Sequence, residues 1–279
     1  MPFFRHDGGE IHYQARGRGG PPLVFVHGLA CALDDWRHQV RRFAPSRRVV
    51  CLDQRGHGRS RGYTSGFDMA TLGADLAALL ARLRLPPALL VGHSMGCRVI
   101  LECARTSPAA VAGLALIDGS RLASTSAASA GAATRDAIRQ LGYETFFERL
   151  FTQMFTPSSD PAIREAVVAR AKRMPEVVGA ALMVSMVAWD AESVEEALEN
   201  LQVPVMVLQS TCLNERRERV SLRGDESVPW LAFIRERVRQ ADMEVVPGVG
   251  HFTMLEASDT VNRRIEAMLE RIEAGQTPG

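Results

Sequence analysis

The sequence predicts an α/β fold in which a mostly parallel, doubly wound sheet is interrupted by a helical insertion. Short apolar runs alternate with segments whose apolar residues recur at helical spacing, as in a parallel sheet covered by helices. The alternation stops after residue 119 and resumes after residue 200, and the segment between shows helical patterns without a convincing strand. We therefore expect a core domain of residues 1–119 and 201–279 and a helical cap, or lid, of residues 120–200.

The elements before the insertion follow from turn residues and apolar spacing. Runs that suit strands are bounded by glycine, proline or charged residues, and one helical pattern ends where two prolines follow it. The expected strands are residues 10–15, 22–26, 48–52, 88–91 and 113–117, and the expected helices are residues 72–85 and 97–106. The run at 88–91 is wholly apolar, which suits a parallel strand that is buried on both faces.

The elements after the insertion resume the same alternation. We expect strands at residues 203–209 and 243–247, with helices at residues 230–240 and 261–274.

Composition limits the possible partners and the compartment. The 33 lysine and arginine residues nearly balance the 32 aspartate and glutamate residues, so no overall charge favours nucleic acid or an anionic membrane. The five cysteines form no C-x-x-C pair, which favours reduced thiols. Residues 1–18 lack the apolar stretch of a signal peptide, and no run approaches the roughly 20 apolar residues of a membrane span. We expect a cytoplasmic monomer or homodimer that binds a small molecule and neither nucleic acid nor membrane.

A G-x-S-x-G motif, Gly92-His93-Ser94-Met95-Gly96, joins the apolar strand at 88–91 to the helix that follows. The motif is informative in this strand-turn-helix context, where a very tight turn leaves the serine oxygen exposed. Glycines are needed on both sides because side chains there would collide with neighbouring backbone. The sequence therefore predicts that Ser94 is a nucleophile.

His251 is the histidine best placed to activate that serine. A serine hydroxyl is a weak nucleophile until a neighbouring base takes its proton. Among the seven histidines, His251 follows the last strand on a glycine-rich turn, at the sheet edge where open α/β sheets bind ligands. His27, His57 and His93 are also expected near this edge, where a structural hydrogen bond is the simpler explanation for each.

Four segments together resemble the α/β-hydrolase family along nearly the whole chain. They are His27-Gly28, the run D-Q-R-G-H-G-R-S at 53–60, the turn at Ser94, and the G-H-F sequence at 250–252. The resemblance implies an oxyanion hole formed by the backbone N–H groups of Leu29 and Met95. Such pre-aimed donors each stabilise a tetrahedral intermediate by roughly 3 to 4 kcal/mol.

The acid that would orient His251 departs from the commonest family pattern. Most relatives carry an aspartate a few residues after the strand that is here 203–209, but this chain has Leu213 at that place. Asp118 ends the strand at 113–117, and haloalkane dehalogenases and zearalenone-type lactonases are similar in taking the acid from that strand. Glu215 is the alternative, although its mixed-charge surroundings are typical of a solvated face. We expect Asp118 to be the acid that orients His251.

Neither a cofactor nor a metal is expected. The run at 53–60 contains glycines and arginines but lacks the spacing of a phosphate-binding loop, so a structural loop is the simpler interpretation. The histidines are too scattered for a metal site, with no H-E-x-x-H motif and no paired cysteine ligands.

The helical insertion is rich in large, soft apolar side chains, which suit the roof of an apolar pocket. The expected pocket residues are His27, Cys31, Phe151, Met154, Phe155, Met186 and Trp189. A cap residue at helical spacing more often packs between cap helices than contacts substrate.

These features predict a serine hydrolase that cleaves a small, largely apolar ester or lactone through an acyl-enzyme intermediate. Carbon–carbon bond hydrolases, thioesterases and cofactor-free perhydrolases resemble this chain in using the same groups. A small-molecule receptor with this fold is the alternative outside enzymes.

Overall fold

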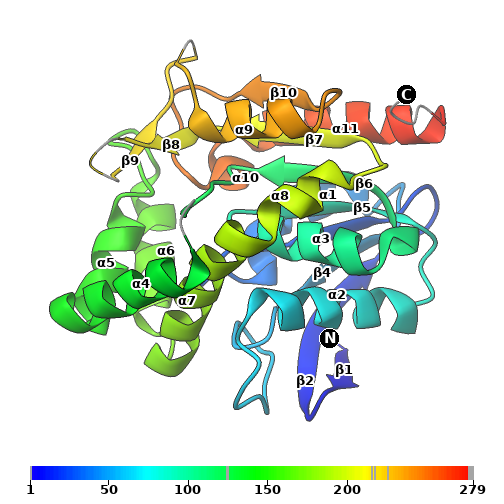
Figure 1. Cartoon of the computed structure of the whole chain (residues 1–279). Coiled ribbons are helices and arrows are strands. Elements are labelled where there is room, and N and C mark those ends of the chain that lie inside the picture. Colours follow the sequence, from blue (N-terminus) through cyan, green and yellow to red (C-terminus); the bar gives the residue numbers. More distant parts are fainter. Residues whose placement is uncertain (1, 124–125, 215, 217, 225, 276–279) are drawn as a thin grey trace.

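The core of the protein is an eight-stranded sheet with the strand order β1-β2-β4-β3-β5-β6-β7-β10 (Figure 1). The computed structural model describes residues 2–123, 126–214, 216, 218–224 and 226–275. The strands are β1 (Phe3–His6), β2 (Gly9–Arg16), β3 (Leu23–Val26), β4 (Val49–Leu52), β5 (Ala88–His93), β6 (Val111–Ile117), β7 (Val205–Gln209) and β10 (Asp242–Val245). The predicted α/β fold with a mostly parallel sheet is confirmed.

Strand direction changes only at the N-terminal edge of the sheet. There β1 pairs with β2, and β2 with β4, in antiparallel fashion, whereas β4, β3, β5, β6, β7 and β10 are parallel neighbours. Every residue of β3, β4, β5 and β7 is buried, as expected of parallel strands that are covered on both faces. The carboxyl ends of β5, β6, β7 and β10 consequently lie along one edge, where the candidate site is found.

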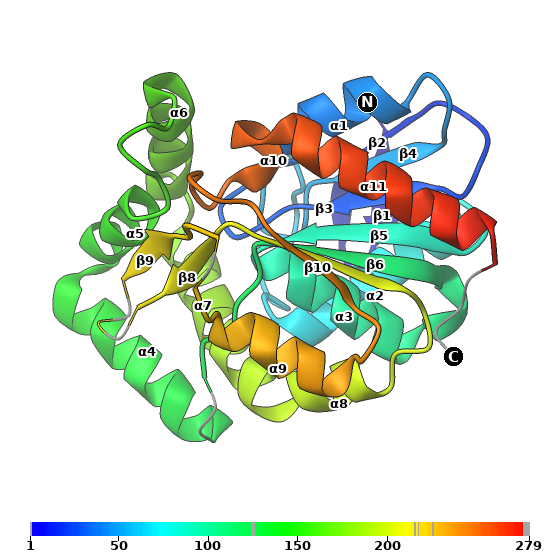
Figure 2. The same cartoon turned by 90° about the horizontal axis from the view of Figure 1, so that it is seen from above.

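Helices cover both faces of the sheet, as the view from above shows (Figure 2). Helices α1 (Arg37–Phe43) and α11 (Ser258–Glu273) pack together on one face, and α2 (Met69–Arg82) packs against α3 (Met95–Thr106) on the other. Helix α9 (Pro229–Arg237) lies on the same face as α3.

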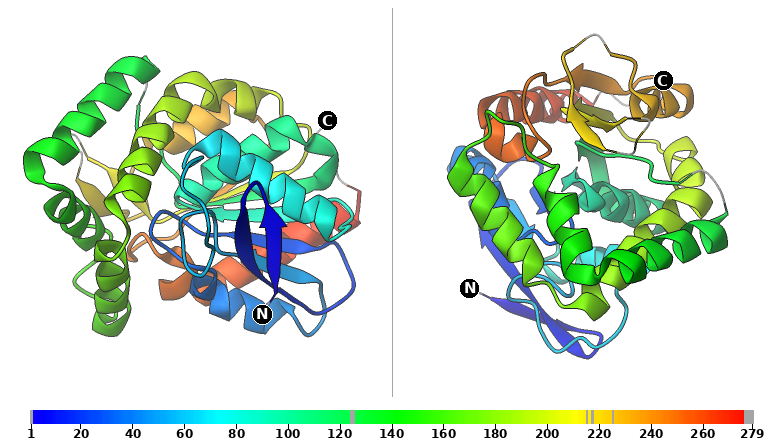
Figure 3. Two further views of the ribbon diagram at one scale, coloured as in Figure 1. Left: turned by 90° about the horizontal axis from the view of Figure 1, so that it is seen from below. Right: turned by 90° about the vertical axis from the view of Figure 1, so that its left-hand side faces the viewer.

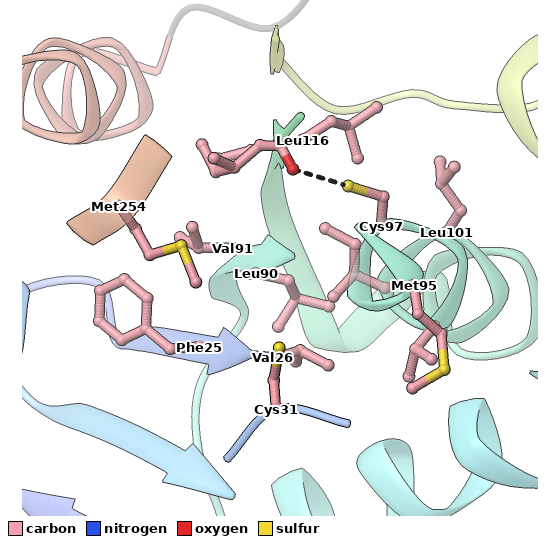
Figure 4. Close-up of a cluster of buried hydrophobic side chains, with 14 of the residues drawn as sticks. Phe25, Val26, Cys31, Leu90, Val91, Met95, Cys97, Leu101, Leu116 and Met254 are labelled. Carbon is pink, nitrogen blue, oxygen red and sulfur yellow. Dashed lines mark hydrogen bonds between the residues drawn. The ribbon is translucent and has the colours of Figure 1, made fainter. Parts of the chain in front are cut away.

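The core beneath the candidate site consists of apolar side chains from the central strands and from α3 (Figure 4). Phe25 and Val91 come from the sheet, and Met95 and Leu101 come from α3. All four are at most 1% exposed. This packing holds the start of α3 rigidly against the carboxyl end of β5.

The segment between β6 and β7 is helical. It contains α4 (Ala127–Leu141), α5 (Tyr143–Thr152), α6 (Pro161–Lys172), α7 (Glu176–Glu192) and α8 (Val194–Glu199). Helices α4 to α7 project to one side of the sheet (Figure 3), whereas α8 packs against α3 and α9 beside the sheet.

Several elements were not predicted from the sequence. They are β1, the 3-10 helix η1 (Leu33–Trp36), α1, the 3-10 helix η2 (Pro108–Ala110), the short helix α10 (Thr253–Glu256) and a separate antiparallel hairpin of β8 (Thr211–Leu213) and β9 (Arg219–Ser221). The hairpin stands on the same side of the sheet as α4 and α5 (Figures 1 and 2).

Within the described part of the chain, no helix taken alone combines the length and apolar character that crossing a membrane requires. Helices α6 and α7 meet that test only when joined, and they are bent by 101° at their junction.

Candidate active site

Ser94 occupies a strained turn between β5 and α3. Its backbone φ of 55° and ψ of −115° lie outside the regions that residues with a side chain favour. A Cβ atom at Gly92 would lie 2.5 Å from the carbonyl oxygen of Gly96, and one at Gly96 would lie 2.2 Å from that of Val26. The backbone is therefore so close on both sides that only glycine fits at either position.

Asp118 lies in the turn that ends β6 and is fully buried. Its Oδ1 atom accepts hydrogen bonds from the backbone N–H groups of Ser210 (2.7 Å) and Thr211 (2.8 Å). Its Oδ2 atom accepts hydrogen bonds from the Thr211 hydroxyl (2.5 Å) and from His251 Nδ1 (2.5 Å). Residues just after β7 thus provide donors to a carboxylate that comes from the neighbouring strand.

His251 is held by its backbone as well as by its ring. Its N–H donates to the carbonyl of Met154 at 2.7 Å, and its own carbonyl accepts a hydrogen bond from His93 Nε2 at 2.9 Å. A Cβ atom at Gly250 would lie 2.6 Å from that Met154 carbonyl, so the glycine is needed for the close approach. The imidazole is therefore fixed beside the residue that precedes Ser94.

The two nitrogens of the His251 ring have different environments. Nδ1 donates to Asp118, whereas Nε2 is buried and has no hydrogen-bond partner among the described residues. With Nδ1 protonated, Nε2 carries a lone pair that can accept a proton. The Ser94 hydroxyl makes no hydrogen bond with any described residue, and hydrogen bonds between catalytic groups often tighten only when substrate is bound.

Burial and nearby charges set the protonation of this pair. Burial, followed by the positive charge of Arg219, lowers the pKa of His251 to about 4, although Asp118 opposes this shift. Burial alone would raise the pKa of Asp118, but the hydrogen bond and charge of His251 and the nearby Arg219 hold it below its ordinary value. At neutral pH the pair is therefore a carboxylate and a neutral imidazole.

Leu29 and Met95, the expected oxyanion donors, lie on either side of the strained turn. Met95 is the first residue of α3, and Leu29 follows Gly28, where a Cβ atom would lie 3.1 Å from the Cβ atom of Ser94. Neither backbone N–H donates a hydrogen bond within the described residues. Both donors are available to a ligand at Ser94.

A cavity of about 890 Å³ opens at Ser94. It extends from Leu29 to the insertion helices, and its wall includes Met154 and Met186 among the residues expected from the sequence. Phe146 and Met183, two of the large apolar side chains of the insertion, also line it, as do Ala130, Ala133 and Val187, which sequence reasoning did not single out.

The other expected pocket residues do not line this cavity. Cys31 lines a separate cavity of about 480 Å³, and His27 bonds with the Gly28 carbonyl at 2.7 Å. Phe151 is buried against Phe147, Phe155 stacks on Phe252, and Trp189 Nε1 donates to Glu102 at 3.0 Å. Helical spacing identifies buried side chains but not which neighbour they meet.

Two further residues, Glu215 and Arg219, bear on the carboxylate that orients His251. Glu215, the alternative, lies outside the described residues. Arg219 was not predicted, yet its Nη1 atom lies 3.6 Å from Asp118 Oδ2 and donates to Thr211 Oγ1 at 2.7 Å. Sequence reasoning missed Arg219 because this residue lies in a mixed-charge run, and such runs are usually solvated.

No metal cluster is formed by the residues that the structure describes, because no three histidine, cysteine, aspartate or glutamate side chains are grouped suitably. Asp53, within the glycine-rich run at 53–60, accepts hydrogen bonds from His12 (2.7 Å) and from the N–H groups of Leu33 (2.8 Å) and Arg59 (3.0 Å). This carboxylate therefore stabilises the loop.

Comparisons with known proteins agree with this architecture. The chain is 28% identical, over 93% of its length, to the dihydrolipoyllysine-residue acetyltransferase component of the acetoin cleaving system of Pseudomonas putida. It is 43% identical, over 40% of its length, to a non-heme chloroperoxidase of Streptomyces lividans. The matches span 66% and 41% of these two relatives, so the chain corresponds to two thirds or less of their length.

A solved structure described as "Est816 as an N-Acyl homoserine lactone degrading enzyme" has the same fold. It aligns with a TM-score of 0.79 and 23% identity over 95% of this chain and 99% of that chain. A model of the alpha/beta hydrolase family matches residues 23–264, from the start of β3 into α11, and so includes the strained turn and the Asp118–His251 pair. This chain therefore belongs to the alpha/beta hydrolase family.

Proposed function

We propose that the protein is a serine hydrolase that cleaves a small, largely apolar ester or lactone. The observation that carries the proposal is the buried 2.5 Å hydrogen bond between Asp118 and His251 Nδ1, which leaves Nε2 without a partner among the described residues. The His251 ring lies 4.6 Å from that of His93, the residue before the strained Ser94. A neutral imidazole with a free Nε2 is what a serine hydroxyl needs in order to become a nucleophile.

In the proposed reaction, Ser94 Oγ attacks the substrate carbonyl carbon while His251 Nε2 takes the hydroxyl proton. The tetrahedral intermediate then collapses, its bond to the leaving oxygen breaks, and His251 passes the proton to that oxygen. Water, activated by the same imidazole, attacks the acyl-enzyme and releases the acid and Ser94. Asp118 keeps Nδ1 protonated and stabilises the imidazolium that forms.

We further propose that Leu29 and Met95 N–H groups bind the oxyanion and that residues 120–200 act as a cap. The unpaired state of both donors supports the first role. The cap role is supported by cavity-lining residues of α4 and α7, and by the hydrogen bond from His251 N–H to Met154. The fold shared with the lactone-degrading Est816 makes lactones suitable first substrates.

A labelling experiment tests the nucleophile. A fluorophosphonate should add once to the folded protein, and peptide mass analysis should assign the adduct to Ser94. A panel of p-nitrophenyl esters, γ-lactones and an acyl thioester then compares substrate classes. An adduct on another serine, or no adduct together with no turnover of any substrate, would contradict the proposal.

The pH dependence follows from His251. Because His251 must be neutral to accept a proton, activity should be present above its pKa and lost as the pH falls through that value. Burial and Arg219 lower this pKa to about 4, so kcat/KM should stay flat from neutral pH down to about pH 5 and fall tenfold per unit below 4. A kcat/KM profile, with circular dichroism to verify folding, checks this. An acidic midpoint at 6.5 or above would be inconsistent with a buried, neutral imidazole.

A further inference from the structure

The wall of the Ser94 cavity contains a buried cation that the proposed acyl transfer leaves unused. Arg219 is the first residue of β9, opposite Leu213 in the hairpin, and its side chain is only 7% exposed. Both Arg219 and Leu213 line the same cavity as Ser94. A buried guanidinium is costly unless its charge and its N–H groups are satisfied.

Few of the hydrogen-bonding groups of Arg219 are used within the protein. A guanidinium has five N–H donors, and here one nitrogen, Nη1, donates to Thr211 Oγ1 at 2.7 Å. The same Nη1 lies 3.6 Å from Asp118, beyond hydrogen-bond distance, and Nε and Nη2 make no hydrogen bond with any described residue. Asp118 itself already accepts four hydrogen bonds of 2.5 to 2.8 Å. Arg219 therefore retains unused donors in the cavity wall.

The other arginines around the cavity differ from Arg219. Arg98 is paired with the carboxylate of Asp190 through hydrogen bonds of 2.8 and 2.6 Å from its Nε and Nη2 atoms, and Nη2 also donates to the carbonyl of Ser120 at 2.7 Å. Arg149 is exposed to solvent. Among the described residues that line the cavity, none is an aspartate or a glutamate. Arg219 is thus the buried cation of this wall that makes no hydrogen bond to a carboxylate among the described residues.

Resting on the proposed function, we propose that the substrate is an ester or lactone that carries a carboxylate, and that Arg219 binds this carboxylate in the Ser94 cavity. A planar carboxylate matches the guanidinium fork and can accept two of its N–H groups at once. The apolar side chains of α4 and α7 would contact the chain between the carboxylate and the scissile bond. Asp118 does not compete for the unused donors of Arg219, because its carboxylate already accepts four hydrogen bonds from other groups.

Binding to an inactive variant tests this site separately from catalysis. In the Ser94→Ala background, monomethyl adipate, which has one ester and one carboxylate, is titrated against dimethyl adipate, which has two esters. We expect the monoester to bind at least about tenfold more tightly, as charge-assisted bidentate pairs are strong. Adding Arg219→Met should abolish this preference, whereas Arg219→Lys should keep part of it, because the charge remains without the fork.

Arg223→Met is the matched control for charge. Arg223 is exposed just after β9, so its replacement removes the same net charge from outside the cavity. The preference for the monoester should change less than about twofold. Equal affinity for the two esters, or a preference that survives Arg219→Met, would overturn the proposal. If Arg219→Met does not fold, Arg219→Lys provides the test: a reduced preference for the monoester supports the proposal, and an unchanged preference contradicts it.

A catalytic comparison separates substrate binding from a role in orienting the catalytic pair. Mono-p-nitrophenyl adipate and p-nitrophenyl hexanoate have acyl chains of equal length, and only the first carries a carboxylate. At neutral pH, Arg219→Met should lower kcat/KM for the adipate ester at least about tenfold more than for the hexanoate ester, and this difference should lie mainly in KM. The acidic limb should move to higher pH for both esters, because Arg219 lowers the pKa of His251. Equal losses in kcat/KM for both esters at neutral pH would mean that Arg219 acts only on Asp118 and His251. Binding without turnover of either ester would instead refute the hydrolase proposal alone.

Discussion

Replacing Ser94 with alanine is expected to lower kcat for a p-nitrophenyl ester by about 10⁶-fold. The variant lacks the only oxygen at the strained turn that can form the acyl-enzyme, while the backbone donors of Leu29 and Met95 remain. A small residual rate from those donors and from substrate binding is expected. Steady-state kinetics with active-site titration of the wild type measures the loss.

Ser107→Ala provides the matched control for this variant. Ser107 lies at the opposite end of α3, and its hydroxyl makes no hydrogen bond with the described residues. Its rate should stay within about threefold of the wild type, since surface changes away from the site have small effects. Near wild-type turnover by Ser94→Ala, in folded protein, would mean that another group attacks the ester.

Asp118→Asn is expected to lower kcat by about 10⁴-fold. The amide oxygen can still accept from the N–H groups of Ser210 and Thr211, which directs the amide NH₂ toward His251. The imidazole must then accept at Nδ1 and carry its proton on Nε2, where it can no longer take the proton of Ser94. Ester kinetics measures the loss, and thermal unfolding verifies that the variant retains its fold.

Glu215→Gln is the companion variant for this prediction. It removes the alternative acid and should leave the rate within about threefold of the wild type. A collapse of the rate in Glu215→Gln but not in Asp118→Asn would transfer the role of the acid to Glu215.

Local constraints made part of the site predictable. The strained turn at Ser94 depends on glycines two residues away on each side. A Cβ atom at Gly92 would collide with the backbone of Gly96, and one at Gly96 would collide with that of Val26 in β3. The signature of the turn is nevertheless contained in five consecutive residues. The position of His251 followed from chain order, since a residue after the last parallel strand must emerge at the same sheet edge.

The hydrogen-bond partners of Asp118 were harder to predict from the sequence. Its position at the end of a strand suggested the role, but its donors lie 92, 93 and 133 residues away in Ser210, Thr211 and His251. Glu215 could not be dismissed on spacing alone, because either strand end can present a carboxylate at this edge.

By itself, the sequence determined the fold class, the chain order of the segments that carry Ser94, Asp118 and His251, and the turn motif around Ser94. These follow from backbone sterics and from apolar periodicity, which act between near neighbours. Only the tertiary structure decided which side chains line the cavity and that Arg219 is buried. Phe151 and Met154 are both apolar and three residues apart, yet Met154 lines the cavity and Phe151 packs within the insertion. Whether a side chain contacts substrate, solvent or another helix depends on elements distant in the chain. Local sequence patterns therefore cannot predict these contacts.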